Sequence, residues 1–266
     1  MALITNPKIG YRRFAGYSIL FDNPGDENYV AHAGRLQLVQ NRPGANPFMD
    51  AATAGMTAIG EGVWEQHGLL QLNPKSYHVT LWDGINHGNV QNVSEPHRLE
   101  AINFLHGIPF SIRSGKQMMR DAADSPLAAW RGDMRYVFDR LAIIADYVLV
   151  ILLKPADDRY AAVQRSVEHL RDDLYQIYDA HYGIGSAGSY MPHLSLGYFL
   201  RHADGRHSLD FVRLWNERLK EAFAERDHPQ LGFQSASLYG FTDMENFYRV
   251  NEAATVGVST APGSAA

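Results

Sequence analysis

The 266-residue chain contains no cysteine, which excludes disulfide bonds and any reaction that needs a thiolate. It also lacks an apolar run as long as the roughly 18 residues that cross a bilayer, so we expect no membrane span and no membrane partner. The segment from Met1 to Arg13 has neither the basic stretch nor the apolar core of a secretory signal. We therefore expect a cytoplasmic protein, since a reducing compartment is compatible with a chain that has no thiols.

Basic residues are not in excess, because 24 Lys and Arg stand against 29 Asp and Glu, giving a net charge of −5 at pH 7. A general binder of DNA or RNA needs a basic surface, so we expect no duplex nucleic acid as a partner. Hydrophobic residues make up 45% of the sequence, which is enough to bury a sizeable core. A small nucleotide or an RNA end fits this composition better than a long duplex does. We also expect a monomer.

Two short segments that are typical of β-strands each carry a histidine two residues before a hydroxyl, with apolar residues between and after. They are Tyr77–Leu81 and Pro192–Leu196. Because successive side chains of a strand point to opposite faces, His78 shares a face with Thr80, and His193 shares a face with Ser195. If the strands lie side by side, two imidazoles and two hydroxyls converge on one patch. Such a patch is suited to holding and cleaving a phosphate ester.

Either motif alone is also explained by a half-buried strand histidine that has a hydroxyl neighbour by chance. The occurrence of two such motifs, both flanked by apolar residues, favours a shared site. His78 and His193 are 115 residues apart (78 to 193), which is close to half of the chain. This spacing indicates two related lobes that contribute one motif each.

The motifs and their surroundings resemble the two-histidine (2H, LigT-like) phosphoesterases, a superfamily defined by two His-x-Thr/Ser motifs. The stretch Ser76-Tyr77-His78-Val79-Thr80, followed by Trp82-Asp83-Gly84, is similar to a less-characterised branch, and Met191 to Tyr198 fits the second motif. The resemblance implies an α+β, bilobal duplicated LigT-like fold with two antiparallel-rich sheets flanking a central cleft and helices on the outer faces. We expect one such domain over residues 1–250, and a mobile C-terminal tail over residues 251–266 because that stretch has no apolar period.

The resemblance implies that His78 and His193 are the general acid and the general base, in an order that the sequence leaves open. It also implies that Thr80 and Ser195 hydrogen-bond the phosphate oxygens. Imidazole suits both roles because its ordinary pKa of about 6.5 allows either protonation state near neutral pH. This scheme needs no metal and no cofactor. The expected enzyme is a hydrolase of phosphoric diester bonds that opens 2′,3′-cyclic or 2′,5′-linked nucleotide or RNA-end phosphodiesters, with a preference for 2′,3′-cyclic phosphates.

Two alternatives remain open. The first is a nucleotide-binding or regulatory protein that uses the same cleft without turnover. The second is a metal-dependent hydrolase built on His202 and His207, which have Asp204 and Asp210 beside them. This spacing matches no recognised ligand motif, so a solvated polar loop is favoured there.

Three further residues are candidates for the lining of the cleft because of where they stand relative to the two motifs. Trp82 is two residues beyond Thr80, so strand alternation places it on the histidine face, where an exposed indole could stack on a base. A tryptophan that covers the sheet edge explains the position equally well. Gly197 and Gly188 are the other candidates for the cleft lining. Residues 183–188 match G-x-G-x-x-G, but they follow a helix and precede a strand, so we expect a flexible loop bordering the cleft rather than a dinucleotide site.

Other polar and aromatic residues receive weaker assignments. We expect Tyr77 and Tyr198 in the core, and Tyr239 on either face of its strand. The remaining basic and histidine candidates are interpreted as ordinary surface residues: Arg12, Arg13, Arg35, His87, His97 and His106.

Hydrophobic periodicity predicts the framework. Helices are expected over 157–178 and 209–224, with a weaker one from Ser94 that turns Leu99, Ile102 and Leu105 inward. Residues 41–62 are rich in Gly, Ala and Pro, so we expect an irregular excursion there, with a flap near the cleft as its candidate role. Strands are expected over residues 17–21, 34–39, 68–72, 147–153 and 231–239.

Overall fold

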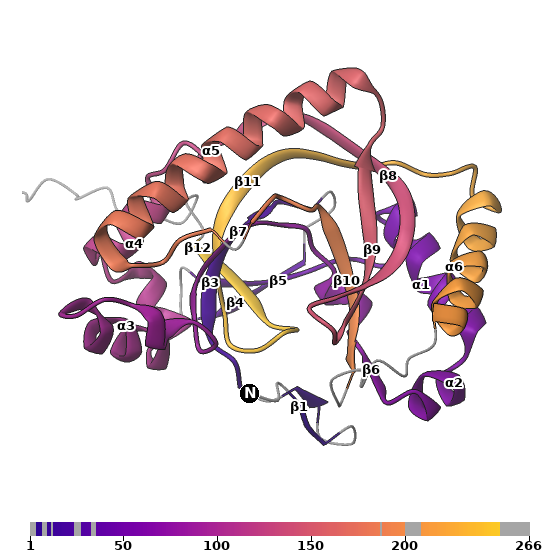
Figure 1. Ribbon diagram of the computed structural model, residues 1–266, viewed down its shortest axis with the longest axis horizontal. Helices are drawn as coiled ribbons and strands as arrows, with labels where there is room; N and C mark the ends of the chain where they lie inside the picture. The colour runs from indigo at the N-terminus through magenta and orange to yellow at the C-terminus, as the bar shows by residue number, and fades with distance from the viewer. Residues whose placement is uncertain are drawn as a thin grey trace, which may run out of the picture.

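The computed structural model describes residues 4–6, 10–11, 13–23, 28–32, 36–186, 188–199 and 209–250. Helices and strands are mixed along the chain, which confirms the expected α+β class (Figure 1). The strands are β1 (Ile4–Asn6), β2 (Gly10–Tyr11), β3 (Gly16–Phe21), β4 (Asn28–His32), β5 (Leu36–Gln40), β6 (Leu69–Gln71), β7 (Thr80–Asn86), β8 (Arg131–Ile144), β9 (Val148–Pro155), β10 (His193–Phe199), β11 (Leu231–Phe241) and β12 (Phe247–Val250). The α-helices are α1 (Pro47–Ile59), α2 (Glu61–Gln66), α3 (His97–His106), α4 (Gln117–Ala123), α5 (Asp158–Tyr182) and α6 (Leu209–Ala224).

Within the described ranges, all strands except the small β1-β2 pair belong to one antiparallel sheet, in which β11 is shared by two curved parts. Residues 231–235 of β11 pair with β8, whereas residues 236–241 pair with β3 and residues 240–241 also pair with β12. One part therefore runs β4-β5-β12-β11-β3-β7, and the other runs β11-β8-β9-β10-β6. The two parts curve into an open ring, with β3, β7 and β12 opposite β9 and β10, and the helices outside it (Figure 1).

The strands bury apolar side chains on both faces of the sheet. In β9, alternate residues belong to the main core, which also contains residues of α1, α5 and α6: Leu149, Ile151 and Leu153. The intervening residues form a small cluster on the opposite side: Val148, Val150 and Leu152. In β3, Ile19 belongs to the main core, whereas Leu20 belongs to a third cluster with Val39, Tyr239, Phe241 and Phe247. We call the side with Leu149 and Ile19 the helix face, and the side with Val150 and Leu20 the inner face.

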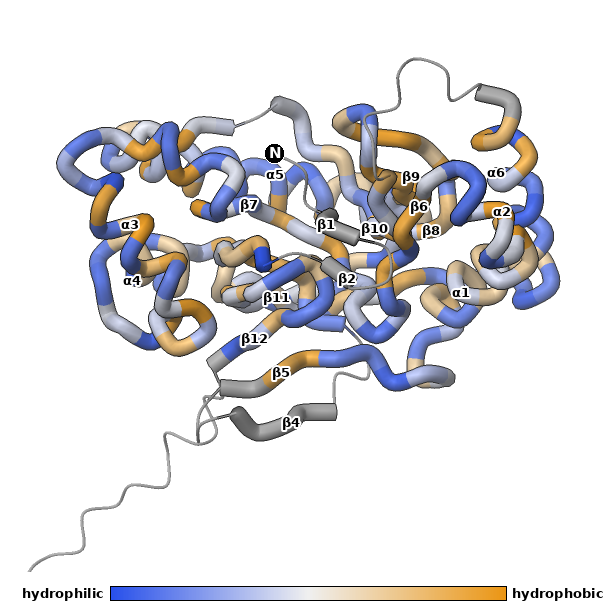
Figure 2. The backbone as a smooth tube through the Cα atoms, turned by 90° about the horizontal axis from the view of Figure 1, so that it is seen from below, coloured by the Kyte–Doolittle hydropathy of each residue, from blue (hydrophilic) through white to orange (hydrophobic). Residues whose placement is uncertain are grey.

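The two long helices were largely predictable. Asp157 caps α5 by accepting a hydrogen bond from the backbone nitrogen of Tyr160 at 3.1 Å, and Gly183 ends the helix with φ of 73°. The helix therefore continues four residues beyond the expected end. The expectation for α6 is confirmed at both ends. Figure 2 shows hydrophobic and hydrophilic segments alternating along α4, in which Met118, Met119 and Ala122 are buried.

The expectation of an irregular flap over 41–62 was wrong. The segment forms α1 and α2, and Asn46 caps α1 by accepting hydrogen bonds from the backbone nitrogens of Phe48 (3.1 Å) and Met49 (3.4 Å). A proline in the first turn is compatible with a helix, and alanine favours one. Small residues are needed because α1 packs closely on α6: a Cβ on Gly55 would lie 3.2 Å from the Cα of Leu219.

The remaining elements differ in detail from expectation. α3 begins at His97 rather than Ser94, and its buried residues are Ala101, Phe104 and Leu105, so Leu99 is 66% exposed instead of turned inward. The strands expected at 17–21, 68–72, 147–153 and 231–239 are present with slightly shifted ends. β5 covers the described part of the expected 34–39 strand, and the predicted tail over 251–266 lies outside the described residues. None of the helices in the described ranges is both long and apolar enough to cross a membrane.

Candidate active site

His78 lies two residues before β7, in an extended segment that follows a single 3-10 turn at Pro74–Ser76. The expected strand over 77–81 therefore starts only at Thr80, although the alternation of faces holds: His78 and Thr80 are half-buried, whereas the residues between and beside them are buried. The segment is fixed from the side, because the carbonyl oxygen of Tyr77 accepts hydrogen bonds from the amides of Asn23 (2.7 Å) and Asn41 (2.6 Å). The backbone next to His78 is thus held in place by two asparagine side chains.

His193 is the first residue of β10, as its motif predicts. In the register with β9, His193 lies opposite Leu152 and Ser195 lies opposite Val150. Both partners belong to the inner-face cluster of β9, so both motif side chains point to the inner face. On the other part of the sheet, Thr80 lies opposite Leu20, which is also an inner-face residue. The two motifs therefore face the interior of the ring from opposite parts of the sheet.

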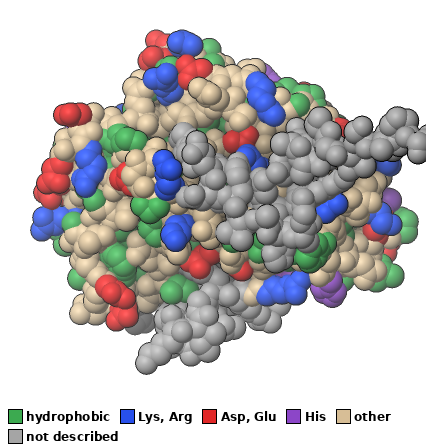
Figure 3. Space-filling view, turned by 180° about the vertical axis from the view of Figure 1, so that it is seen from behind, with side chains coloured by type: hydrophobic (Ala, Val, Ile, Leu, Met, Phe, Trp, Pro, Cys, Tyr) green, Lys and Arg blue, Asp and Glu red, His purple; other side chains and the backbone are tan. Residues whose placement is uncertain are grey.

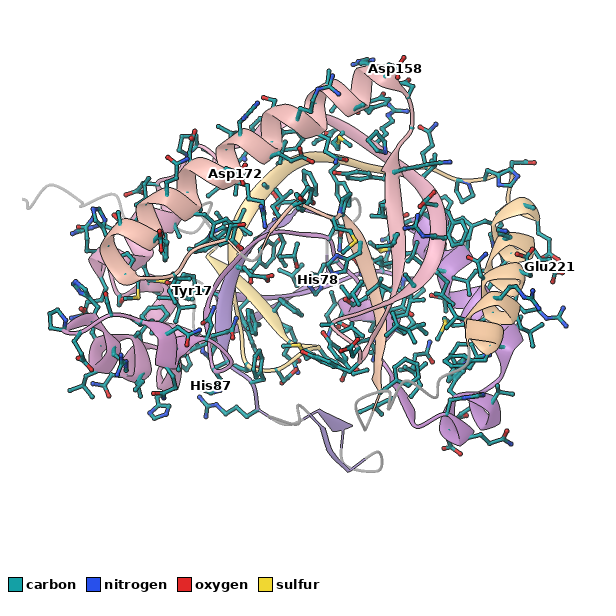
Figure 4. All side chains as sticks on the ribbon, viewed as in Figure 1. Tyr17, His78, His87, Asp158, Asp172 and Glu221 are labelled. Carbon is teal, nitrogen blue, oxygen red and sulfur yellow. The ribbon has the colours of Figure 1, made fainter. Side chains whose placement is uncertain are left out.

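The two imidazoles are held in the same way. His78 Nδ1 lies 2.7 Å from the carbonyl oxygen of Ser76, and His193 Nδ1 lies 2.8 Å from the carbonyl oxygen of Met191. A carbonyl oxygen can only accept, so each Nδ1 carries the proton of this hydrogen bond. Each Nε2 is then left to accept or to donate a second proton away from the backbone. In Figure 4, His78 lies in the interior of the ring of strands.

Both motif strands contain a β-bulge one residue after the hydroxyl. In β7 the register moves from Thr80 opposite Leu20 to Trp82 opposite Ile19, so Leu81 is the extra residue. In β10 the register moves from Ser195 opposite Val150 to Gly197 opposite Leu149, so the extra residue is Leu196. A bulge reverses the alternation of side chains beyond it. Beyond the bulge, Trp82 and Gly197 therefore point to the helix face. The residues that follow them, Asp83 and Tyr198, point to the inner face.

This bulge corrects the expectation for Trp82. Its indole is fully buried on the helix face, at 0% exposure, with its ring centroid 4.6 Å from that of Tyr178. It cannot stack on a base in the ring interior. Gly197 occupies the equivalent position in β10 and is buried against β6: a Cβ there would lie 2.6 Å from the carbonyl oxygen of Leu70. Gly197 therefore allows close pairing of two strands and does not line the site.

The bulges bring two further residues to the inner face, Asp83 and Tyr198, each five residues after its histidine. Asp83 lies opposite Ser18 and Tyr198 lies opposite Val148. The Tyr198 hydroxyl donates a hydrogen bond to the Met244 sulfur at 3.3 Å, and interacts with Ser195. The expectation that Tyr198 lies in the core was therefore only partly right, since its ring packs on apolar residues while its hydroxyl reaches the site. If the faces alternated strictly along each strand, a residue five positions after the histidine would lie on the opposite face. The sequence pattern therefore did not indicate either residue.

The electrostatics of the two histidines differ. His78 packs against Phe247, with ring centroids 4.2 Å apart, and its pKa is lowered to about 4. Burial is the main cause of this lowered pKa; the Ser76 carbonyl opposes it, and the nearby charge of His193 adds to it. His78 is therefore neutral at pH 7. The charge of His193 also lowers the pKa of Asp83 in part, so His193 interacts electrostatically with both His78 and Asp83.

The Asp83 side chain is exposed, although protein atoms surround it closely enough to affect its pKa. Burial accordingly raises the pKa of Asp83, while the charges of His193 and Arg171 lower it in part. Within the described residues, the Thr80 hydroxyl makes no hydrogen bond and is free to bind a ligand. Beside the two imidazoles, the inner face thus presents the hydroxyls of Thr80, Ser195 and Tyr198 and the carboxylate of Asp83.

A second polar group on the inner face was not found by sequence reasoning. The Asp22 carboxylate accepts hydrogen bonds from the hydroxyls of Ser235 (2.6 Å), Ser237 (2.9 Å) and Tyr239 (2.7 Å), and from Arg249 at 3.0 Å. Tyr239 lies opposite Ser18, which settles its face as the inner one. Asp22 therefore holds a cation and several hydroxyls in fixed positions near the Phe247 side of the site.

Several other candidates lie elsewhere. The Arg13 guanidinium donates to the carbonyl oxygen of His106 at 3.0 Å, and His87 Nδ1 accepts from the backbone nitrogen of Ala15 at 3.1 Å. Gly188 is exposed in the loop before β10, which confirms that the glycine-rich stretch is a helix-to-strand connection. Five further candidates lie outside the residues whose side chains are described: Arg12, Arg35, His202, Asp204 and His207. Asp210 also falls among residues whose side chains are not described, and elsewhere in the described chain no three His, Asp or Glu residues group as metal ligands.

Comparisons with known proteins add the fold alone. No family model matches the chain, and no curated protein matches it. The chain is similar to the crystal structure of a conserved protein of unknown function from Agrobacterium tumefaciens, with a TM-score of 0.53 and 11% sequence identity. This similarity covers 91% of the present chain and 87% of the other. At that identity the match supports the arrangement of helices and strands and says nothing of activity.

Proposed function

We propose that the protein is a phosphodiesterase that opens 2′,3′-cyclic or 2′,5′-linked nucleotide phosphodiesters by paired-histidine acid and base catalysis, without a metal. The observation that carries the proposal is the matched setting of His78 and His193. Each is held through Nδ1 by the carbonyl oxygen two residues earlier, and each shares the inner face with a hydroxyl two residues later. Two imidazoles facing one interior can serve an in-line displacement at phosphorus, one on each side.

The difference in electrostatics between the two histidines supports a division of roles. His78 is neutral at pH 7 and suits the general base, which takes a proton from the attacking water. His193 lies near the Asp83 carboxylate, which stabilises the imidazolium that gives a proton to the leaving ribose oxygen. The bond from phosphorus to water oxygen forms as the bond to the ribose oxygen breaks, and a phosphomonoester results. Thr80 and Ser195 donate hydrogen bonds to the non-bridging oxygens.

The same proposal includes the bilobal duplicated architecture of the two-histidine phosphoesterases. Its support is that each half of the chain supplies a strand with the same sequence of features: histidine, hydroxyl, bulge and inner-face polar residue. A single domain over residues 1–250 would then consist of two lobes, one on each side of the ring interior.

The test is an assay with a panel of 2′,3′-cyclic nucleotides and 2′,5′-linked dinucleotides, with a chelator present. We expect turnover that the chelator leaves unchanged, and a loss of at least ~100-fold for either His78→Ala or His193→Ala. His169→Ala, an exposed histidine on α5, is the matched control and should keep full activity. Loss of less than tenfold in either variant contradicts the proposed roles, and binding without turnover favours a nucleotide-binding protein instead.

A further inference from the structure

A groove of about 580 Å³ lies between α5 and the loop that leads into β10. One wall consists of residues 168–179 of α5, and the other of residues 185–186 and 188–190. Its volume is within the range of small-molecule sites, roughly 300–1,000 Å³. The catalytic scheme above does not use this groove.

The groove contains one cation that is almost wholly buried. Arg171 is 8% exposed, and its guanidinium lies 4.7 Å from the ring centroid of Tyr175 and 5.6 Å from that of Tyr190. It donates to Asp172 at 3.3 Å and to the carbonyl oxygen of Gly188 at 3.4 Å. Both hydrogen bonds are long and both use Nη1. The guanidinium also interacts with the Tyr175 hydroxyl and with the charge of Asp83, and Arg171 is one of the residues that line the groove.

Carboxylates line the same groove. Glu168, Asp172 and Asp179 lie on the α5 wall, and the last two are exposed. One guanidinium among three carboxylates does not favour a second phosphate group, because the acidic side chains repel it. The groove instead favours a neutral group that offers hydrogen-bond acceptors to the arginine and donors to the carboxylates.

The groove adjoins the candidate active site at Asp83. The Tyr175 hydroxyl donates to the carbonyl oxygen of Asp83 at 3.5 Å, across the boundary between α5 and β7. Tyr190 is only three residues before His193, so their Cα atoms are at most ~11 Å apart. A nucleotide whose phosphate lies between the two histidines can therefore direct its base past Asp83 toward the groove.

We infer that the groove between α5 and the loop before β10 binds the base of the nucleotide substrate and selects guanine. Guanine presents O6 and N7 as acceptors, the pair that arginine recognises most often, and amino and imino hydrogens as donors for a carboxylate. Uracil lacks an exocyclic amino group to offer a carboxylate. The inference rests on the proposed function, because it takes the phosphate to lie at the histidine pair.

The experiment compares kcat/KM for the 2′,3′-cyclic phosphates of guanosine, adenosine, cytidine and uridine. We expect guanosine to exceed uridine by at least ~10-fold, the size of one good bidentate contact. Arg171→Lys, which keeps the charge and loses the planar fork, should remove this preference by raising KM for the guanosine compound toward the uridine value. An unchanged circular dichroism spectrum shows that the variant is folded. Arg165→Met, an exposed position on α5 outside the groove, is the matched control and should keep the preference.

A binding measurement separates this inference from the proposed function. Calorimetry with the His193→Ala protein compares guanosine 3′-monophosphate with uridine 3′-monophosphate. Tighter binding of the guanosine compound, abolished by adding Arg171→Lys, supports the base site even if no substrate is turned over. Equal turnover of all four cyclic nucleotides overturns the base site and leaves the phosphodiesterase intact. If neither turnover nor selective binding is observed, the base site and the phosphodiesterase activity are both overturned.

Discussion

His78 and His193 make the same contact from opposite parts of the sheet: each Nδ1 lies within 2.8 Å of the carbonyl oxygen two residues earlier. The contact fixes both the ring orientation and the nitrogen that carries the proton, so both Nε2 atoms are available to a ligand. Yet the surroundings of the two rings differ, since one lies on Phe247 and the other near Asp83. Equal geometry with unequal electrostatics is what an acid and base pair requires.

The first prediction concerns the pH dependence of kcat/KM on a 2′,3′-cyclic nucleotide. The base must be unprotonated, and His78 takes up a proton only as the pH falls through its pKa of about 4. The acidic limb of the profile should therefore have its midpoint near pH 4, well below the ordinary histidine value of 6.5. Stopped-time assays across pH 3.5 to 8 measure the limb, in the pH range where the wild type remains folded. An acidic midpoint at the ordinary histidine value contradicts the assignment of His78 as the buried base.

A second prediction concerns stability, because the lowered pKa of His78 links folding to protons. Between pH 6.5 and about 4 the unfolded chain binds a proton at this position and the folded chain does not, so stability falls as the pH falls through this window. Each tenfold difference in proton affinity is worth about 1.4 kcal/mol, so the loss approaches roughly 3 kcal/mol. Urea unfolding at pH 7 and pH 4.5 should show a smaller decrease for His78→Asn than for the wild type. His169→Asn is the control, and a decrease equal to wild type in both variants contradicts the linkage.

A third prediction tests Asp83 as a positioning residue for His193. Asp83→Asn removes the carboxylate whose charge interacts with His193, so kcat should fall at least ~10-fold, which corresponds to about 1.4 kcal/mol. KM should stay close to wild type, because the proposed phosphate contacts come from Thr80 and Ser195. Tyr198→Phe is the matched change at the equivalent position of the other strand, and it removes no charge. An equal fall in kcat for both variants would show that Asp83 has no electrostatic role.

Sequence patterns predicted the elements that obey simple periods. The stripe along α5 and the apolar run of β9 were found because one side of a helix and both faces of a strand are buried there. β8 was missed because its charged residues, among them Arg131, Asp133 and Arg140, face solvent and interrupt the apolar pattern. α1 was missed because Gly55 and its alanines were interpreted as loop residues, whereas close packing on α6 requires small side chains.

The site was predictable only as far as alternation holds. The face shared by each histidine with its hydroxyl is visible in the sequence, but a bulge depends on pairing with a neighbouring strand and leaves no period in the chain itself. Trp82 was therefore placed on the wrong face, and Asp83 was overlooked, by one inserted residue at Leu81. The hydrogen bonds of Asp22 were not predicted for a related reason, because its partners lie more than 200 positions away along the chain.

The corrected position of Trp82 gives a fourth prediction. Because the indole is buried on the helix face, Trp82→Ala should destabilise the fold by about 3–5 kcal/mol. Trp82→Phe keeps most of the packing, and it should leave KM for a cyclic nucleotide unchanged, since the ring does not reach the inner face. Urea unfolding and steady-state kinetics measure the two effects. An increase in KM without loss of stability would return Trp82 to the binding site.

The last prediction concerns Gly197, where the bulge of β10 brings the backbone close to β6. A Cβ at this position would lie 2.6 Å from the carbonyl oxygen of Leu70 and 3.1 Å from the Cα of Gln71, and backbone atoms cannot move aside cheaply. Gly197→Ala should therefore cost about 1–3 kcal/mol of folding stability, as overpacking commonly does. Gly62→Ala is the matched control: a Cβ there meets nothing within 4 Å, and alanine favours the helix, so stability should stay equal or rise slightly. Equal effects of the two substitutions in urea unfolding would mean that β6 and β10 are not in close contact.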